Sequence, residues 1–345
     1  MGFFMMKKTA IALGIAALGF GAQAAEVFKN ADTAVEINLD LQFSNLNVVD
    51  TASAQARNYL NGSGTQVQFK VSKIINEDLT VFGQLEYDPD PVTDHATVVT
   101  DDMKFGIKSK TWGTIQMGQF DTYMEDELME IANYFQVAGG LVANIITEPS
   151  AGNDGRHLMW KHQIGGFGIG LDFTSGVNTG AATAATDGSN GFATTVSYTL
   201  GDLKVVYGSS TIARYKAGST STNSSKAAQG FGASYSMTTD AGVTKFAFLS
   251  ATNTSYNATA AYDGLDTKYN MASIVHDYGP WRFGVINSVR DAAMTSSAAA
   301  TTYNEVGTMV SYDIGKGAKL YVQNSNYGYS SGLYNQTEVG FVMSF

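Results

Sequence analysis

The sequence predicts an all-β fold, a closed sheet of 16 antiparallel strands that crosses a membrane. Three observations lead to this prediction: apolar and polar residues alternate along nearly the whole chain, short turns alternate with long polar connections, and charged residues recur on the polar faces of the strands. The composition agrees, because the chain has 37 glycines, 4 prolines and only 15% charged residues, against about 25% in typical globular chains.

The N-terminus has the three parts of a secretory signal peptide. Lys7 and Lys8 precede the apolar run 10–20, and a small-residue Ala-Gln-Ala sequence follows it. The run has 11 residues, which is too short to span a bilayer. We therefore expect residues 1–24 to be cleaved and residues 25–345 to form the mature barrel.

The mature chain is acidic. The whole chain has 21 basic and 31 acidic residues, and removal of Lys7 and Lys8 leaves 19 basic residues, a formal charge of −12. Nucleic acid is not expected as a partner, because binding a polyanion requires a basic surface. The chain has no cysteine, which excludes a disulfide framework and a thiolate metal site.

The strand pattern is clearest near the start of the mature chain. Over residues 35–43, five apolar residues alternate with four polar ones without an error, as expected for a strand with one apolar and one polar face. The pattern recurs at residues 66–71, 203–207 and 281–290. It is therefore a property of the whole chain and not of one edge strand.

Two kinds of connection separate the strands. Seven are tight turns rich in Gly, Pro, Asp and Asn, at 75–78, 110–113, 164–166, 200–202, 238–242, 277–280 and 313–317. Eight are long and polar, at about 44–64, 88–100, 121–155, 175–190, 210–229, 251–266, 291–301 and 326–332. Their strict alternation predicts 16 antiparallel strands with both termini on the short-turn side, each about 9–11 residues long as a tilted membrane strand requires.

The polar faces of these strands carry charge. The residues that we expect to point inward include Glu36, Asp40, Lys70, Glu86, Lys104, Lys108, Arg282, Arg290 and Lys319. In a dry core such charges would cost several kcal/mol each. A barrel of about 16 strands is wide enough for water, so the charges predict a water-filled pore surrounded by lipid.

Aromatic residues near strand ends fit the same arrangement. Rings with one wet and one apolar side favour the membrane interface, although tyrosine is also a good strand former. The residues expected in such girdles are Trp160, Tyr198, Tyr207, Tyr235, Tyr269, Trp281 and Tyr312.

The chain resembles the general diffusion porins of Gram-negative outer membranes over essentially the whole mature sequence. The stretches that carry the resemblance are AEVFKNADTAVEINLDLQF at the mature start, INEDLTVFGQLEY, GIKSKTWGTIQMGQFDT, and a terminal phenylalanine on an alternating strand. The resemblance implies a 16-stranded homotrimeric barrel embedded in outer-membrane lipid and lipopolysaccharide. It also implies passive diffusion of small hydrophilic solutes past a third loop that folds into the lumen.

The third long connection, residues 121–155, is the longest. Its first half has five acids within ten residues, and two more acids follow: Asp121, Glu125, Asp126, Glu127, Glu130, Glu148 and Asp154. The resemblance implies that such acids lie across the constriction from basic wall residues, where a transverse field orients dipolar solutes. A solvated helical turn with the acids facing water is the alternative.

The wall departs from the family pattern. Where enterobacterial relatives have arginines, the matching inward positions here are Gln66, Lys70, Lys104, Lys108 and Lys161. Lysine keeps the positive charge without the rigid fork of arginine. The acidic excess predicts a mild preference for cations, since carboxylates raise the local cation concentration.

Other functions find little support in the sequence. The histidines at 95, 157, 162 and 276 occur in no catalytic or metal-binding signature, so we expect no enzyme, no catalytic residue, no metal and no cofactor. A substrate-specific channel and a surface adhesin or receptor barrel remain alternatives, because the loops at 175–190 and 210–229 have the composition of variable surface.

The chain ends in an alternating strand, TEVGFVMSF. Thr337, Val339, Phe341, Met343 and Phe345 are expected to face lipid, and the strand is expected to close the barrel against the one that begins near residue 35. The resemblance further implies that Phe345 is read by the outer-membrane assembly machinery.

Overall fold

The computed structural model describes most of residues 25–345, and every structural statement below refers to the described residues. They are residues 25–50, 55–61, 65–89, 98–132, 157–175, 188–215, 222–257, 265–292, 301–315, 317–329 and 332–344. The expected signal peptide at 1–24, Glu148, Asp154 and Phe345 lie outside this part of the chain.

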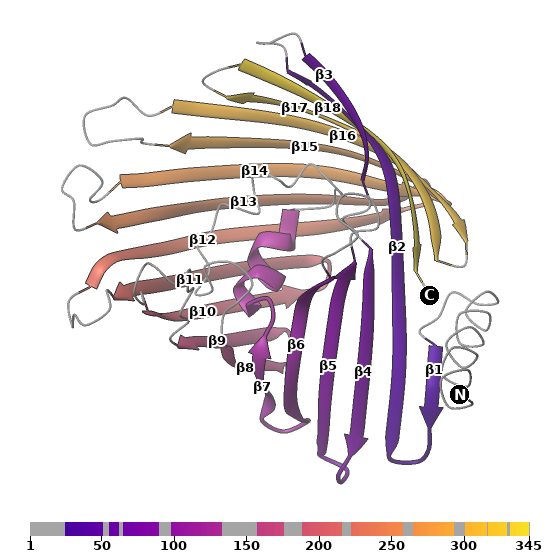
Figure 1. The fold of residues 1–345 in the computed structure, drawn as a ribbon, viewed down its shortest axis with the longest axis vertical. Helices are drawn as coiled ribbons and strands as arrows, with labels where there is room; N and C mark the ends of the chain where they lie inside the picture. The colour runs from indigo at the N-terminus through magenta and orange to yellow at the C-terminus, as the bar shows by residue number, and fades with distance from the viewer. Residues whose placement is uncertain are drawn as a thin grey trace, which may run out of the picture.

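The structure is a single sheet of long strands (Figure 1). The strands are β1 Ala25–Lys29, β2 Thr33–Asp50, β3 Gln55–Asn61, β4 Gln66–Ile74, β5 Leu79–Pro89, β6 Val98–Ser109, β7 Gly113–Gln119, β8 His157–Ile164, β9 Phe167–Ser175, β10 Gly188–Leu200, β11 Leu203–Tyr215, β12 Thr222–Thr239, β13 Gly242–Asn257, β14 Leu265–Tyr278, β15 Trp281–Ala292, β16 Thr301–Gly315, β17 Ala318–Tyr329 and β18 Gly332–Ser344. Two short helical segments, η2 Glu125–Met129 and η3 Glu130–Ala132, follow β7.

The sheet closes into a ring of 16 strands. Each strand from β4 to β18 pairs antiparallel with the next, β2 pairs with β4, and β18 returns to β2 with Ser344 opposite Asp40. Closure satisfies the backbone groups of the first and last strands, which is the condition for a sheet in lipid. The predicted 16-stranded antiparallel barrel and its closing strand pair are confirmed.

The two additional strands lengthen this ring and do not widen it. β3 pairs with residues 44–50 of β2, in line with β4, which pairs with residues 33–40. β1 pairs with residues 34–37 of β2, just beyond the end of β18. Along β2, β3 is therefore collinear with β4, and β1 is collinear with β18.

The seven predicted short turns all join consecutive strands, from the turn between β4 and β5 to the turn between β16 and β17. Gly201 and Gly279 have φ of +59° and +55° in two of them, a conformation that residues with a Cβ rarely adopt. The prediction was wrong for the extent of four long loops. β2 continues to Asp50, β12 begins at Thr222, β13 continues to Asn257 and β17 continues to Tyr329, so the first, fifth, sixth and eighth connections are shorter than expected.

The extension of β2 has a physical explanation. From residue 44 onward the apolar residue Leu46 faces inward and is buried, while Asn45 faces outward and is exposed. This reverses the polarity expected of a strand in lipid. Asn45 lies opposite the apolar Val339 of β18, so this polar residue interrupts an otherwise apolar outer face, and the stretch resembles a loop in the sequence although the pairing continues.

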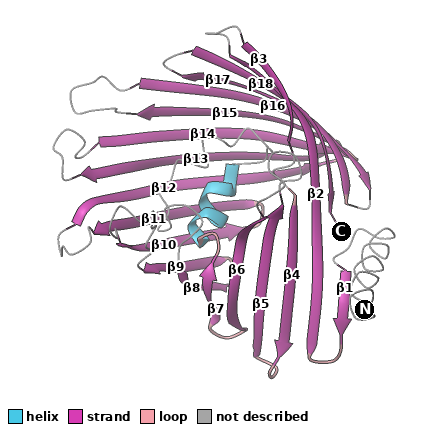
Figure 2. Cartoon of the chain, in the orientation of Figure 1, coloured by secondary structure: helices cyan, strands magenta, loops and turns pink. Residues whose placement is uncertain are grey.

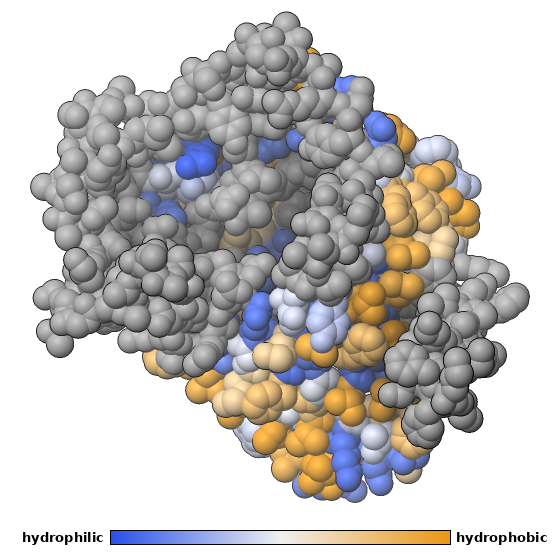
Figure 3. Space-filling model, viewed as in Figure 1, coloured by the Kyte–Doolittle hydropathy of each residue, from blue (hydrophilic) through white to orange (hydrophobic). Residues whose placement is uncertain are grey.

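The outer face of the barrel is apolar. Phe43, Phe105, Phe173, Phe231 and Val339 are each between 46% and 60% exposed and lie on the outward side of their strands. Figure 3 shows apolar residues gathered on the outside of the barrel. Such a surface is suited to contact with lipid.

Most of the predicted aromatic girdle residues lie on this outer face. Tyr198, Tyr207, Tyr235, Trp281 and Tyr312 are at least 36% exposed there, and the Trp160 indole N–H donates to the carbonyl of Trp112. Tyr269 was assigned wrongly. It is 3% exposed and faces inward, where its ring lies 5.6 Å from the guanidinium carbon of Arg290.

The helical segments η2 and η3 lie inside the ring of strands (Figure 2). They contact β10 to β14. No helix in the described part of the chain is long and apolar enough to cross a membrane.

Candidate pore constriction

The third connection enters the barrel through a capped helical turn. Thr122 accepts a hydrogen bond through its hydroxyl oxygen from the N–H of Glu125, at 3.2 Å, which is the arrangement of a helix N-cap. One residue later, the N–H of Tyr123 donates to Oδ1 of Asp172 on β9, at 3.4 Å. The start of the segment is thereby attached to the wall.

One side of the segment is apolar and buried. Met124 and Leu128 are fully buried and Ile131 is 6% exposed, at the spacing that places residues on one helical face. They pack with inward residues of the wall, among them Val206, Ala228, Leu249, Met271 and Ile286. The segment therefore rests on β10 to β14 through an apolar contact.

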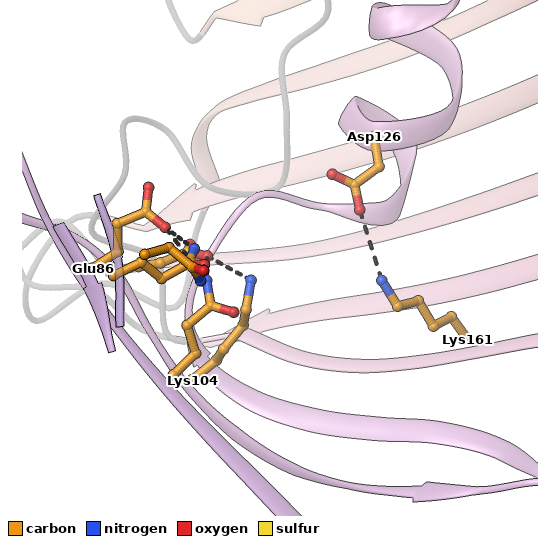
Figure 4. Close-up of polar contacts among 8 residues, drawn as sticks. Glu86, Lys104, Asp126 and Lys161 are labelled. Atoms are coloured by element: carbon orange, nitrogen blue, oxygen red, sulfur yellow. Dashed lines mark hydrogen bonds and ion pairs between the residues drawn. The ribbon is translucent and has the colours of Figure 1, made fainter. Parts of the chain in front are cut away.

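The other side of the segment is acidic and meets two wall lysines. Oδ2 of Asp126 lies 3.7 Å from Nζ of Lys161 on β8 (Figure 4). Oε2 of Glu127 lies 2.8 Å from Nζ of Lys204 on β11. The Lys161 ammonium also lies 5.5 Å from the centre of the Tyr123 ring. Two loop carboxylates are thus paired with cations on the wall next to the loop.

Burial affects the first of these carboxylates. It raises the pKa of Asp126 above the ordinary value for aspartate, although Lys161 and Lys104 act in the opposite direction. Asp126 is about half exposed, so it remains in contact with the lumen.

A second polar group lies on β4 to β6. Gln68 donates to Glu86, Gln84 donates to Asp102 at 2.9 Å, and Lys104 forms an ion pair with the same Asp102 carboxylate. The Lys104 ammonium lies 5.8 Å from the centre of the Phe120 ring. Figure 4 shows this group and the Asp126–Lys161 pair on different parts of the wall.

A third polar group closes the ring where β18 meets β2. Glu338 is fully buried and accepts hydrogen bonds from Ser44, from the Tyr321 hydroxyl at 3.0 Å and from Gln323 at 2.7 Å. Gln42 donates to the Tyr321 hydroxyl oxygen at 3.0 Å. The carboxylate is held by neutral donors from two strands, Ser44 of β2 and Tyr321 and Gln323 of β17.

The predicted wall residues all occupy inward positions in the strand register. The pairs Glu36↔Lys70, Asp40↔Gln66 and Thr114↔Lys161 fix the side of these residues. The pairing of β4 to β7 likewise shows that Glu86, Lys104 and Lys108 face inward. Arg282 forms an ion pair with Asp277, and Arg290 lies opposite Tyr269.

The structure brings only some of these residues together. Lys161 meets Asp126, and Glu86 and Lys104 belong to one hydrogen-bonded group. Of the other loop acids, Asp121 and Glu130 are exposed and Glu125 is partly buried.

Sequence reasoning missed Lys204 and Asp102 as members of the site. Each occupies an inward position of a strand, so the alternation rule applied to β11 and β6 could have found it. No group of His, Asp or Glu in the described ranges could hold a metal ion.

A closed sheet with an apolar outside and a charged inside defines a membrane barrel with a water-filled lumen. Residues 9–332 match the family model described as Gram-negative porin. The chain belongs to this family, whose members are non-enzymatic channels. No curated protein matches the sequence significantly.

Solved structures agree on the fold. The anion-selective porin from Comamonas acidovorans has a TM-score of 0.71 at 14% identity, over 91% of this chain and 100% of the porin. OmpF of Salmonella typhi in complex with daunomycin has a TM-score of 0.70 at 15% identity, over 93% of this chain and 100% of OmpF. The trimer form of OmpT of Vibrio cholerae has a TM-score of 0.64 at 14% identity, over 91% and 100%. The family match identifies the protein as a porin channel of the outer membrane.

Proposed function

We propose that this porin is a general diffusion channel for ions and small hydrophilic solutes, with a mild preference for cations. The observation that carries the cation preference is the pairing of the loop acids and wall lysines. Lys104, Lys161 and Lys204 each have a carboxylate partner. Because these pairs neutralise the basic residues next to the loop, the excess of 31 acidic over 21 basic residues in the chain is expected to raise the cation concentration in the lumen.

The third connection, residues 121–155, is proposed to narrow the channel. Its first part lies inside the barrel on β10 to β14. The apolar side of this part is buried against the wall, and Asp126 on its acidic side is exposed. This arrangement supports a constriction lined by acids from the loop and by polar side chains from β4 to β6.

Export, assembly and partners complete the proposal. Residues 1–24 would be cleaved on export, and three copies would assemble in outer-membrane lipid and lipopolysaccharide. Phe345 would serve as an assembly signal. A homotrimer is supported by the trimer form of OmpT among the similar structures. Deletion of Phe345 is expected to lower the amount of assembled trimer, and unchanged amounts would refute the signal.

The selectivity can be tested in planar bilayers. Purified protein that has not been heated is placed in a salt gradient, and the reversal potential is measured together with the size of conductance steps. We expect a cation-selective potential and steps in groups of three. A zero or anion-selective potential contradicts the cation preference, and single steps contradict the trimer.

A substrate-specific channel or an adhesin is the alternative to general diffusion. Liposome swelling with sugars of increasing size separates these functions. General diffusion predicts a smooth size limit, whereas a saturable preference for one sugar indicates a specific site.

A further inference from the structure

The apolar side of the loop lies on glycines of the wall. A Cβ built on Gly208 of β11 would lie 2.9 Å from Cγ of Met124, and one built on Gly230 of β12 would lie 3.0 Å from Cδ2 of Leu128. Ordinary contact between carbon atoms requires about 3.5–4.0 Å. Any larger residue at these positions would therefore move the loop or its side chains.

The same holds for Gly232, the next inward residue of β12. Its Cβ would lie 2.7 Å from Cγ2 of Ile131 and 3.2 Å from Cδ1 of Leu128. Leu128 thus sits above two glycines of one strand. Ile131 cannot easily turn away, because its Cγ2 is attached at the branched Cβ.

Tyr123 is seated on β9 in the same way. A Cβ on Gly170 would lie 2.0 Å from the ring carbon Cδ1 of Tyr123, and one on Gly168 would lie 2.9 Å from the Tyr123 hydroxyl oxygen. The ring is rigid and 9% exposed. A methyl group at position 170 would displace it by about 1.5 Å to restore ordinary contact.

These glycines are costly in strands. Glycine weakens a strand because it contributes no side chain to packing, and it often marks a close approach of another part of the chain. All five face inward on strands that the loop segment covers: Gly168, Gly170, Gly208, Gly230 and Gly232. We call these five residues the glycine seat.

The seat also fixes the charged side of the segment. Asp126 and Glu127 lie between Met124 and Leu128 in the chain, so they move with the residues that occupy the seat. Their pairs with Lys161 and Lys204 span 3.7 Å and 2.8 Å. A shift of about 1.5 Å away from the wall would alter both pairs and narrow the lumen.

We propose that the glycine seat sets how far the third loop projects into the lumen, and thereby the cross-section and charge geometry of the channel. The five glycines are positioning residues that touch no solute. The inference rests on the proposed function, in which this loop narrows the channel.

Alanine substitutions test the seat by single-channel conductance in planar bilayers. We expect Gly170→Ala to lower the conductance by roughly a quarter or more, because the loop moves by about 1.5 Å. Gly232→Ala should have a smaller effect and Gly230→Ala the smallest, in the order of their contact distances of 2.0, 2.7 and 3.0 Å.

The matched control is Gly83→Ala on β5. Its Cβ would lie 3.4 Å from Cγ1 of Val71 and away from the loop, so the variant adds the same methyl group to a barrel strand. We expect wild-type conductance. Unchanged conductance in Gly170→Ala, or an equal loss in Gly83→Ala, would overturn the proposal.

A second variant covers the case in which Gly170→Ala does not assemble. Combining it with Tyr123→Ala removes the clashing ring, and the double variant is compared with Tyr123→Ala alone. Restored assembly, or conductance equal to that of Tyr123→Ala, supports the seat; an additional loss in the double variant overturns it. Failure of the proposed channel function would appear separately, as absence of conductance in the wild-type protein.

Discussion

The inner face of this barrel has two kinds of wall. On β4 to β6 the inward side chains are polar and joined in a network that includes Gln68, Glu86, Asp102 and Lys104. On β11 to β14 the inward residues beneath η2 and η3 are mainly glycine, alanine and buried apolar residues. We call the first the polar wall and the second the covered wall.

The difference shows what strand alternation can and cannot reveal. Alternation of two residues tells which side chains face inward. It does not tell whether water or another part of the chain meets them there. The inward residues of the covered wall are apolar, as in a packed core, because the third loop and not water lies against them.

The largest expected effect comes from placing a charge on the covered wall. Leu249→Asp puts a carboxylate at a position that is 1% exposed, without a cationic partner in the apolar cluster. An uncompensated buried charge costs about 3–5 kcal/mol. Denaturant unfolding of the assembled protein measures the loss, and Thr80→Asp on the polar wall, which faces inward opposite Lys108, is expected to cost far less. Equal losses would contradict the distinction between the walls.

A charge on the outer face should cost somewhat less. Val339→Lys replaces an outward residue that is 54% exposed, and lysine costs about 2–4 kcal/mol at the middle of a bilayer. Folding into lipid vesicles measures the change. Gln336→Lys, on the inward side of the same strand, is the control. If Gln336→Lys destabilised the folded barrel as much as Val339→Lys, the outer face would not be distinguished from the inner face by contact with lipid.

Removal of a lysine beside the loop is expected to act on selectivity. Lys204→Gln leaves Glu127 without its partner at 2.8 Å and should raise the cation-to-anion permeability ratio by roughly twofold, since an exposed pair is worth about 0.2–1 kcal/mol. Reversal potentials in a salt gradient give this ratio. Lys110→Gln, in the turn between β6 and β7, should leave it unchanged, and a shift toward anions in Lys204→Gln would contradict the assignment.

The smallest effect is expected from pH. Because burial raises the pKa of Asp126, this carboxyl group binds its proton at a higher pH than an ordinary aspartate. The loop therefore loses this negative charge at a higher pH than it would with an ordinary aspartate, and part of the cation preference should decline there. Asp126→Asn should lack this part of the decline. An identical pH profile in both proteins would rule out Asp126 as its source.

Much of the fold could be predicted from the sequence. The ring of 16 strands, the seven short turns and the inward side of residues such as Lys70 and Lys161 all follow from alternation and turn chemistry. Errors arose where the environment changes along a strand. The outward Asn45 breaks the apolar alternation opposite Val339, and Tyr269 lies on the inner face although tyrosine is common in girdles.

The candidate site was less predictable. The loop acids and Lys161 were expected from composition and resemblance, but the Glu127–Lys204 pair depends on which strands the loop crosses. That course is set by contacts distant in sequence, such as Leu128 above Gly230 and Gly232. Glycines at inward positions of neighbouring strands are the sequence signal that could have indicated this contact.

The central claim, that one wall of the lumen faces water and the other lies beneath the loop, can be tested directly because the chain has no cysteine. Single cysteines at Gln84→Cys and Leu249→Cys are exposed to a charged thiol reagent while channel conductance is recorded. The account predicts rapid modification and a fall in conductance for Gln84→Cys, and little change for Leu249→Cys. Equal modification at both positions would contradict it.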